Sequence, residues 1–419
     1  MDSFKIKGPS KINGTVEISG SKNAALPIMV ATIARPGLYE ISNVPDLRDT
    51  RTMIKLIEII GGSISSSNNT LKIDTRYCNN PNAPYDLVKT MRASFYVLGP
   101  LLSRFQKASV SLPGGCAWGP RPVDFHLKAF EQMGADVILE NGYIQASGKL
   151  SGADIIFKVS SVGATGNVLM GCFNLNSQLT IKNASMEPEI TDLCHFLVKM
   201  GLKIDGIGTK NLTVYPNDSK SSINIKHKII PDRIEAGTFI AAAVITKSQL
   251  TIKNIIISDI KNVLDSFIYI GLKILESSET SITIDFSGEI KKLNISTDVF
   301  PGFPTDMQPQ WTSVMCLSNV ESIVEDTIYH DRFSHIPELI RLGANIKLKN
   351  NVVTIYGVDK LKAADVMCTD LRAGAALILA ALASEGTTNV SRVYHVDRGY
   401  ENFESKLRSL GVEICRISS

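Results

Sequence analysis

The feature of this chain that most constrains its fold is a helix ending that recurs six times. In each copy an apolar residue is followed by Gly-x-x-Ile or Gly-x-x-Val, the pattern of a glycine that ends a helix just before a strand. The spacing is nearly constant, at 67 to 73 residues, and the glycines are Gly61, Gly134, Gly201, Gly271, Gly343 and Gly411. Six units of about seventy residues therefore fill the chain, and the sequence predicts an internal sixfold repeat.

Every unit also contains an earlier segment rich in small and apolar residues. These segments are residues 23–34, 92–102, 164–173, 236–245, 306–317 and 372–383. A helix that is apolar on all sides is buried, so we expect these six to form the inner layer of each domain. A short β-rich stretch and a more amphipathic helix follow each of them, which predicts a β-α-β-α-β-β unit.

The length of 419 residues sets the number of domains. Hydrophobic cores stop growing at roughly 250–300 residues, so we expect an α/β protein of two domains with three repeats each. The segment NIKHKIIPDR has mixed charge and a proline near residues 227–233. It lies close to the midpoint of the chain, where a crossover between domains is expected.

Composition excludes several classes of protein. A net charge of +3, with 44% hydrophobic and 20% charged residues, is typical of an ordered globular protein without a polybasic tail. The longest small-apolar run, residues 373–383, is far shorter than the roughly 20 residues that cross a bilayer, so no membrane span is expected. The first residues lack the apolar core of a secretory signal, which favours the cytoplasm. Seven cysteines without CxxC spacing indicate neither a disulfide framework nor a metal site.

Cations stand where helices are expected to begin. A positive side chain at a helix N-terminus costs about 0.3–1 kcal/mol unless an anion is near. Taken singly, each is more often a solvated surface side chain than a ligand contact. As a set they predict a site for a small polyanion, whereas the low net charge argues against DNA. The cations before the inner helices are Lys22, Arg92, Arg233 and Arg372, and those before the second helices are Arg121, Arg332 and Arg398.

One cysteine stands apart from the other six. Cys116 lies in SLPGGCAWGPRP, where adjacent glycines allow the thiol to be presented at a loop tip. Arg121 is close enough in sequence to favour the thiolate. Cysteines on apolar helices are usually buried small side chains, which is the expectation for Cys172, Cys194 and Cys316.

Two aspartates have both a structural and a functional interpretation. Asp306 lies inside Thr305-Asp-Met-Gln308, which matches the capping-box pattern, so its carboxylate either complements a helix start or does chemistry. Asp370 has the same capping interpretation. The histidines show no metal or triad spacing, and structural roles are expected for His126, His335 and His395.

These segments resemble the enolpyruvyl transferase family along the whole chain. The motifs that carry the resemblance include ISGSKNAALPI, LPGGCAWGPRPVDFHL, SVGATGN, PDRIEAGTF, FPTDMQPQ, TDLRAGAALILAALA and DRGYENFESKL. The resemblance implies an inside-out α/β barrel of two domains that bind substrates between them. One domain would span residues 22–230 and carry the Cys116 loop. The other would combine residues 1–21 with 231–419 and carry Asp306 and Arg398.

The resemblance also implies an activity. The enolpyruvyl group of phosphoenolpyruvate would pass to the 3-hydroxyl of UDP-N-acetylglucosamine with release of phosphate, the first committed step of peptidoglycan synthesis. No metal or organic cofactor is implied. The family pattern makes Asp306 the base and Cys116 the acid or the covalent partner at C2. Lys22, Arg121 and Arg398 would bind phosphoenolpyruvate, and Lys22 and Arg398 also count among the catalytic residues.

The remaining implied substrate contacts are Asn23, Arg92, Pro122, Val123, Asp124, Phe125, Ser161, Val162, Gly163, Ile328, Arg332, Asp370 and Arg372, with Asp306 among the UDP-sugar contacts. Two alternatives stay open. The sister branch of the family, which acts on shikimate 3-phosphate, shares the fold but has Lys-Ser where this chain has Lys22-Asn23, and it lacks the cysteine loop. A repeat-built nucleic-acid-binding scaffold is the alternative from a different class; its affinity would fall steeply with salt.

Overall fold

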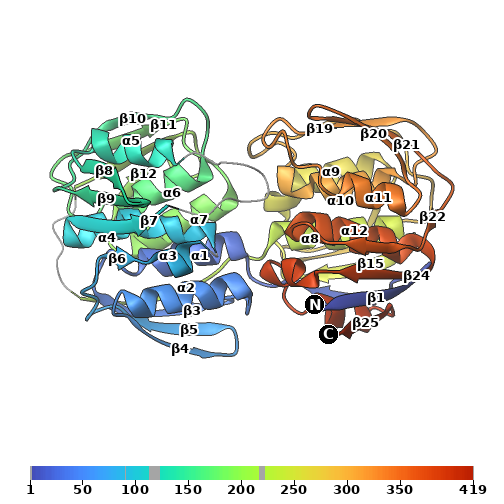
Figure 1. Cartoon of the computed structure of the whole chain (residues 1–419), viewed down its shortest axis with the longest axis horizontal. Coiled ribbons are helices and arrows are strands. Elements are labelled where there is room, and N and C mark those ends of the chain that lie inside the picture. The colour runs from blue at the N-terminus through green and yellow to red at the C-terminus, as the bar shows by residue number, and fades with distance from the viewer. Residues whose placement is uncertain (1, 90, 113–122, 217–221, 419) are drawn as a thin grey trace. The chain divides into compact units, whose positions relative to one another are not determined.

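The computed structural model describes residues 2–89, 91–112, 123–216 and 222–418, which form two compact units. One unit contains residues 20–230, and the other combines residues 1–19 with 231–419 (Figure 1). The α/β class and the two-unit organisation are as expected. The bounds of the two functional domains, 22–230 and 1–21 with 231–419, remain a prediction.

The unit of residues 20–230 contains three successive repeats. The first comprises α1 (Lys22–Ala31), β3 (Gly37–Ser42), α2 (Arg48–Ile59), β4 (Ser63–Ser67) and β5 (Thr70–Asp74). The second comprises β6 (Asn82–Ala83), α3 (Tyr85–Val88), η1 (Arg92–Val97), α4 (Leu98–Phe105), β7 (Lys107–Ser111), α5 (Asp124–Gln132), β8 (Asp136–Glu140) and β9 (Tyr143–Ser147). The third comprises β10 (Asp154–Ile156), α6 (Val162–Met170), β11 (Leu179–Lys182), α7 (Pro188–Lys199), β12 (Lys203–Asp205) and β13 (Asn211–Tyr215), and β14 (Ile223–Lys228) follows it.

The other unit begins with β1 (Ser3–Gly8) and β2 (Thr15–Glu17) and continues after residue 230. Its first repeat comprises α8 (Arg233–Ile245), β15 (Gln249–Lys253), α9 (Ile257–Tyr269), β16 (Lys273–Ser277) and β17 (Ser281–Asp285). Next come β18 (Ile295–Ser296), η2 (Thr305–Met307), α10 (Gln308–Met315), β19 (Ser322–Glu325), α11 (Ile336–Arg341), β20 (Asn345–Lys349) and β21 (Val352–Tyr356). The last repeat comprises β22 (Leu361–Lys362), β23 (Asp365–Met367), α12 (Leu371–Ala383), β24 (Ser384–Ser391), η3 (Val393–Arg398), α13 (Phe403–Ser409) and β25 (Glu413–Ile417).

Each repeat contributes to one small sheet, and the second, third and fifth repeats supply all the strands of theirs in the same order. In the second repeat the order is β6-β7-β9-β8, and in the third it is β10-β11-β13-β12. The first pair is parallel because an inner helix connects its two strands, and the remaining pairs are antiparallel. The expected β-α-β-α-β-β unit is therefore confirmed.

Strands that are distant in sequence complete three of the sheets. β14 pairs with β3, and β2 pairs with β15, both in parallel. β1 lies between β24 and β25 and is antiparallel to both, with Phe4 opposite Val390 on one side and Arg416 on the other. The sixth sheet is thus completed by residues 3–8 at the start of the chain (Figure 1).

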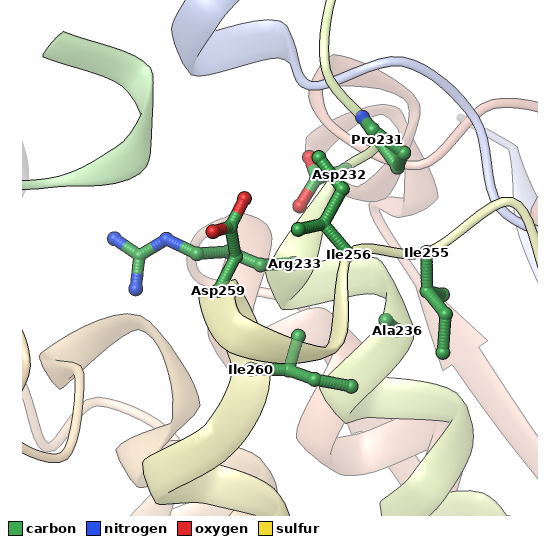
Figure 2. Close-up of a pocket in the computed structure, with 8 residues that line it drawn as sticks. All are labelled: Pro231, Asp232, Arg233, Ala236, Ile255, Ile256, Asp259 and Ile260. Carbon is green, nitrogen blue, oxygen red and sulfur yellow. The ribbon is translucent and has the colours of Figure 1, made fainter. Parts of the chain in front are cut away.

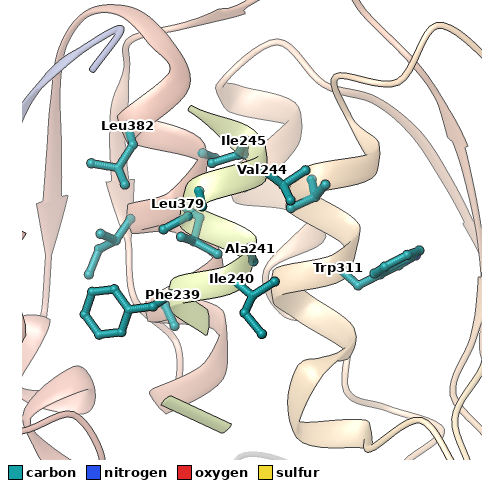
Figure 3. Packing of buried hydrophobic residues seen from close by; sticks show 14 of the residues in the cluster. Phe239, Ile240, Ala241, Val244, Ile245, Trp311, Leu379 and Leu382 are labelled. Atoms are coloured by element: carbon teal, nitrogen blue, oxygen red, sulfur yellow. The ribbon is translucent and has the colours of Figure 1, made fainter. Parts of the chain in front are cut away.

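The core of each unit is built on its small-residue helices. Figure 3 shows α8, α10 and α12 side by side, with Ile240, Val244 and Leu379 among the buried side chains of this cluster and Trp311 on the side of α10 that faces away from α8. Trp311 has no exposed surface and packs against Phe267 and Phe303, with ring centroids 5.1 and 5.5 Å away. The expectation of buried inner helices is confirmed. Among the described residues, no helix combines the length and the apolarity needed to span a membrane.

The six repeated glycines all have the backbone conformation that their pattern predicts. Their φ angles lie between 90° and 122°, a region that side chains other than glycine rarely occupy. In each repeat the second helix ends at this residue and the chain turns into the next strand. The sequence period and the structural period are therefore the same.

We predict that Gly343→Ala destabilises the protein through backbone strain alone. Gly343 has a φ of 90°, and a Cβ there would meet only the Lys362 amide nitrogen at 3.9 Å. The expected loss is about 1–2 kcal/mol of unfolding free energy, which corresponds to about 2–4 °C in Tm for each kcal/mol. Gly288→Ala is the control, because Gly288 lies in open space without a positive φ. Equal melting temperatures for the two variants in a thermal scan would contradict the prediction.

Candidate active site

Asp306 lies between two arginines in the unit of residues 1–19 and 231–419. The Arg332 Nη1 atom is 2.6 Å from the Asp306 Oδ1 atom. Arg372 donates from Nη2 at 2.8 Å and from Nε at 3.2 Å, both to Oδ2. Only 8% and 3% of the two arginine side chains are exposed, against 25% for Asp306. The carboxylate is thus the accessible member of a largely buried ion cluster.

This arrangement controls the protonation of Asp306. Burial by itself would raise the pKa of the carboxyl, but the charges of Arg332 and Arg372 outweigh burial and hold its pKa well below the usual range. Burial alone would likewise lower the pKa of Arg372, and the charge of Asp306 raises it instead. Two guanidinium groups thus share one carboxylate, and the charge of Asp232 also acts on Arg372.

The capping-box interpretation of Asp306 is wrong. The Thr305 hydroxyl caps no helix; it donates to the Asp326 Oδ2 atom at 2.6 Å and accepts from the Arg332 Nη1 atom at 3.1 Å. The Asp326 Oδ1 atom in turn accepts from the amides of Ile328 and Tyr329, at 3.0 and 2.8 Å. This network anchors the loop that carries Ile328 and Arg332.

Asp370 confirms its capping interpretation at the start of α12. Its Oδ1 atom accepts from the amides of Arg372 and Ala373 at 2.9 and 3.1 Å, and its Oδ2 atom accepts from the Ser334 hydroxyl at 3.0 Å. The N-terminus of α12 is therefore satisfied within the protein. The Arg372 side chain leaves this turn with its guanidinium 5.4 Å from the centre of the Tyr400 ring.

The ring of Tyr400 packs against the Arg372 guanidinium, and hydrogen bonds hold the Tyr400 hydroxyl in place. Its hydroxyl lies 2.9 Å from the Thr238 hydroxyl and accepts from the Gln310 amide nitrogen at 3.2 Å. Tyr400 follows Arg398, which ends η3 and is half-buried. A Cβ on Gly399 would lie 2.5 Å from the Leu371 side chain, so a larger residue there would require Leu371 to move.

In the unit of residues 20–230, Lys22 opens α1 and has an acidic partner. Its ammonium is 3.2 Å from the Asp49 Oδ2 atom, with 13% and 6% of the two side chains exposed. Ser21 caps the helix by accepting from the Ala24 amide at 3.4 Å. Asn23, the next residue, is exposed. The sequence did not predict Asp49 as a partner of Lys22, because nothing in the local pattern of α2 connects the two residues.

Helices α5 and α6 carry the other described residues of this unit. Val123, Asp124 and Phe125 lie at the start of α5, and the Phe125 ring packs against Phe157 with centroids 6.3 Å apart. Ser161 caps α6 by accepting from the Ala164 amide at 3.2 Å. The first two residues of α6 are also predicted contacts. Val162 is exposed, and Gly163 is half-buried.

His126 joins these two helices. Its Nδ1 atom accepts from the Asn167 side-chain amide at 3.0 Å, and a Cβ on Gly163 would lie 3.1 Å from its Nε2 atom. His335 is fully buried beside Phe333, and burial and the charge of Arg332 lower its pKa to about 3. These contacts agree with the structural roles predicted for both histidines.

Four of the predicted site residues cannot be placed fully. Cys116, Arg121 and Pro122 lie outside the described residues. Arg92 begins η1, and its side chain is also outside what the structure describes. Cys172, Cys194 and Cys316 are buried, as predicted, and burial raises the pKa of the last two thiols to about 12. Within the described ranges no group of three or more His, Cys, Asp or Glu residues could hold a metal ion.

Arg233, the cation at the start of α8, lines a shallow surface depression beside Asp259 that encloses no space large enough for a water molecule (Figure 2). Asp232 caps the helix by accepting from the amides of Ile234 and Glu235 at 2.8 and 3.0 Å. The Arg233 guanidinium stands 5.6 Å from the centre of the Phe300 ring. This helix start therefore differs from that of α12, where Arg372 turns toward Asp306.

Comparison with known proteins gives a consistent result. The family model described as EPSP synthase (3-phosphoshikimate 1-carboxyvinyltransferase) matches residues 6–407. The UDP-N-acetylglucosamine 1-carboxyvinyltransferase of Geotalea uraniireducens is 47% identical over 418 residues, covering 100% of both chains. The enzyme of the same name from Chloroherpeton thalassium is 49% identical over 420 residues, covering 99% of this chain and 97% of its own.

Solved structures show the same fold. The enolpyruvyl transferase NikO from Streptomyces tendae superposes with a TM-score of 0.89 at 22% identity, covering 100% of this chain and 99% of its own. EPSP synthase from Acinetobacter baumannii gives a TM-score of 0.75 at 14% identity over the full length of both chains. The expected two-domain α/β fold is confirmed by these likenesses.

We predict that Asp306→Asn destabilises the protein by about 2–4 kcal/mol at pH 7, because it leaves Arg332 and Arg372 buried beside each other without a counter-charge. The pKa of Asp306 is lower in the folded state than in the unfolded chain, so its contribution is present above about pH 4 and is lost as the pH falls further. Urea unfolding at several pH values measures the difference, which should shrink below pH 4. Asp331→Asn, at an exposed neighbouring aspartate, is the control. A difference that stayed constant with pH would show that the charge of Asp306 is not the cause.

Proposed function

Because the chain belongs to the enolpyruvyl transferase family, we propose that it transfers the enolpyruvyl group of phosphoenolpyruvate to the 3-hydroxyl of UDP-N-acetylglucosamine and releases phosphate. The observation that carries the choice of acceptor is the identity of 46% to 49% with full-length relatives that bear this activity in their name. The reaction would be the first committed step of peptidoglycan synthesis, carried out in the cytoplasm.

The substrates set the first requirement, which is to neutralise charge. Phosphoenolpyruvate carries a carboxylate and a phosphate, and UDP-N-acetylglucosamine carries a diphosphate, so the two repel each other. We assign Lys22, Arg121 and Arg398 to phosphoenolpyruvate, since guanidinium and ammonium groups are the usual partners of both anions. Lys22 is already paired with Asp49, which keeps its ammonium oriented before a substrate arrives.

Asp306 is the proposed base, and its ion pairs regulate it. With both arginines in place its pKa is low, so it accepts a proton poorly at neutral pH. An incoming substrate anion competes for Arg332 and Arg372, and each interaction transferred to the substrate raises the pKa of Asp306. The base therefore becomes effective only when the anionic substrate is bound.

The proposed reaction has two stages. In the addition stage, Asp306 takes the proton of the 3-hydroxyl as its oxygen bonds to C2 of phosphoenolpyruvate, and the electron pair of the C2–C3 double bond takes a proton at C3. In the elimination stage, C3 loses a proton, the double bond re-forms and the bond from C2 to the phosphate oxygen breaks. Cys116 acts as the acid that protonates C3 or as a covalent partner at C2. Each such proton transfer typically contributes about 10²–10⁴ in rate.

The remaining assignments concern orientation of the acceptor. We assign the UDP-sugar contacts to Arg92, Asp306 and Ile328, to the stretch of residues 121–125, and to residues 161–163 at the start of α6. Asn23 and Asp370 complete the proposed set, and Arg332 and Arg372 are proposed to move toward the substrate anions. Holding two substrates in reactive geometry supplies about 7–11 kcal/mol, more than either proton transfer.

We predict that phosphate release from phosphoenolpyruvate depends on UDP-N-acetylglucosamine and not on shikimate 3-phosphate. The family model is described by the shikimate activity, and EPSP synthase shares the fold, so this is the alternative acceptor to test. The expected preference is on the order of 10²-fold or more, because a site built for one polar acceptor leaves groups unpaired with the other. Phosphate release in parallel assays with each acceptor is the measurement. Turnover with shikimate 3-phosphate alone would replace the proposed function by the alternative.

We predict that fosfomycin, an epoxide that mimics phosphoenolpyruvate, alkylates Cys116 selectively. Burial raises the pKa of Cys78 to about 11 and that of Cys368 to about 12, so buried thiols stay protonated at neutral pH. Cys415 is exposed and provides an internal control for reactivity without a binding site. Peptide mass spectrometry should find the adduct on Cys116 and none in Cys116→Ser. An adduct on Cys415 at an equal rate would refute a specific site.

A further inference from the structure

Arg416 in β25 is held by three carboxylates at once. It donates to the Asp397 Oδ1 and Oδ2 atoms at 2.6 and 2.9 Å, and to the Glu404 Oε1 and Oε2 atoms at 2.9 and 3.3 Å. A fifth bond reaches the Asp2 Oδ2 atom at 3.3 Å. A guanidinium has five N–H groups, so every donor of Arg416 is used. Its face also covers the Phe4 ring, 4.8 Å from the ring centre.

The two strongest partners of Arg416 flank one short segment. Asp397 lies in η3 and Glu404 in the first turn of α13, and between them are residues 398–403. This segment contains Arg398, proposed to bind phosphoenolpyruvate, and Tyr400, whose ring supports Arg372. One side chain on β25 therefore fixes both ends of the segment that carries these groups.

We call the contacts of Arg416 with Asp397 and Glu404 the Arg416 clamp. Because Asp397 and Arg398 are neighbours in η3, this clamp also constrains the direction of the Arg398 side chain. Successive side chains of a 3₁₀-helix point about 120° apart. While Asp397 faces Arg416, the Arg398 side chain must leave the helix in a different direction. At the end of η3, the amides of Gly399 and Tyr400 both donate to the Val396 carbonyl at 3.0 Å. Rotation of η3 about its axis would break the bidentate contact.

We propose that Arg416 is a positioning residue that orients Arg398 for phosphoenolpyruvate by clamping Asp397. The inference rests on the proposed function and extends it to a residue outside the substrate contacts. Arginine suits this role because its planar fork can bind two carboxylates bidentately, which a lysine ammonium cannot do. With 24% of its side chain exposed, Arg416 is sheltered enough for these bonds to be stronger than those of a surface pair.

Arg416→Lys and Asp397→Asn test the proposal, and two variants serve as matched controls. Asp2→Asn removes a partner of Arg416 that lies outside residues 397–404. Lys7→Met breaks the exposed pair with Glu413, which joins the same strands β1 and β25. We expect the KM for phosphoenolpyruvate to rise about tenfold in both test variants, with the KM for UDP-N-acetylglucosamine changed less than about twofold. The controls should keep both KM values.

Amide hydrogen exchange gives a readout that does not depend on activity. In Arg416→Lys we expect the amides of Gly399 and Tyr400 to exchange about tenfold faster, while those of α8 stay unchanged. If the wild-type protein shows no turnover, the proposed function is rejected. The exchange result then still tests whether Arg416 holds residues 397–404 in place. Unchanged exchange in these amides, or a lower Tm without a selective rise in the KM for phosphoenolpyruvate, would overturn the proposal. Asp397→Asn decides the question if Arg416→Lys does not fold.

Discussion

The structure places positively charged side chains at or near the N-termini of apolar helices, and the pairing of these charges with aspartates makes that arrangement possible. Arg372 opens α12 with only 2% of its surface exposed, and Arg332 lies close by with 6% exposed. A charge buried to this extent requires a counter-charge, and Asp306 supplies it to both. Lys22 and Asp49 repeat the same solution in the other unit. Apolar helices thus build the core, and charged groups in or beside their first turns are held there by buried counter-charges.

Much of the fold was predictable because it is periodic. The glycine spacing predicted six helix endings, and all six glycines have positive φ. The apolar segments predicted inner helices, as the complete burial of Trp311 illustrates. Insertion of β1 between β24 and β25 could not be predicted from local pattern, because its partners lie almost the whole chain away. Only the family resemblance indicated that the start of the chain belongs with its second half.

The candidate site was predictable in its residue types but not in its contacts. The pattern around Thr305 and Gln308 indicated a capping box because it considers only neighbours in sequence, whereas the partners of Asp306 come from two later segments. Asp49 carried no local signal for the same reason. Asp370 was predictable as a cap because capping is itself a local interaction. The sequence therefore predicted the contact of Asp370, whose partners are neighbours in sequence, and missed those of Asp306 and Asp49, whose partners are distant.

The strand pairings determine which part of the chain can fold first during synthesis at the ribosome. The unit of residues 20–230 has every strand of its sheets once β14 has emerged, so it can fold while the rest of the chain is still being made. β1 and β2 are made first and must wait, β2 for β15 and β1 for β24 and β25 at the very end. During that interval the edges of β1 stay open to incorrect partners. Early folding of residues 20–230, which follow β1 and β2 in the sequence, leaves fewer unpaired strands to which β1 could bind incorrectly.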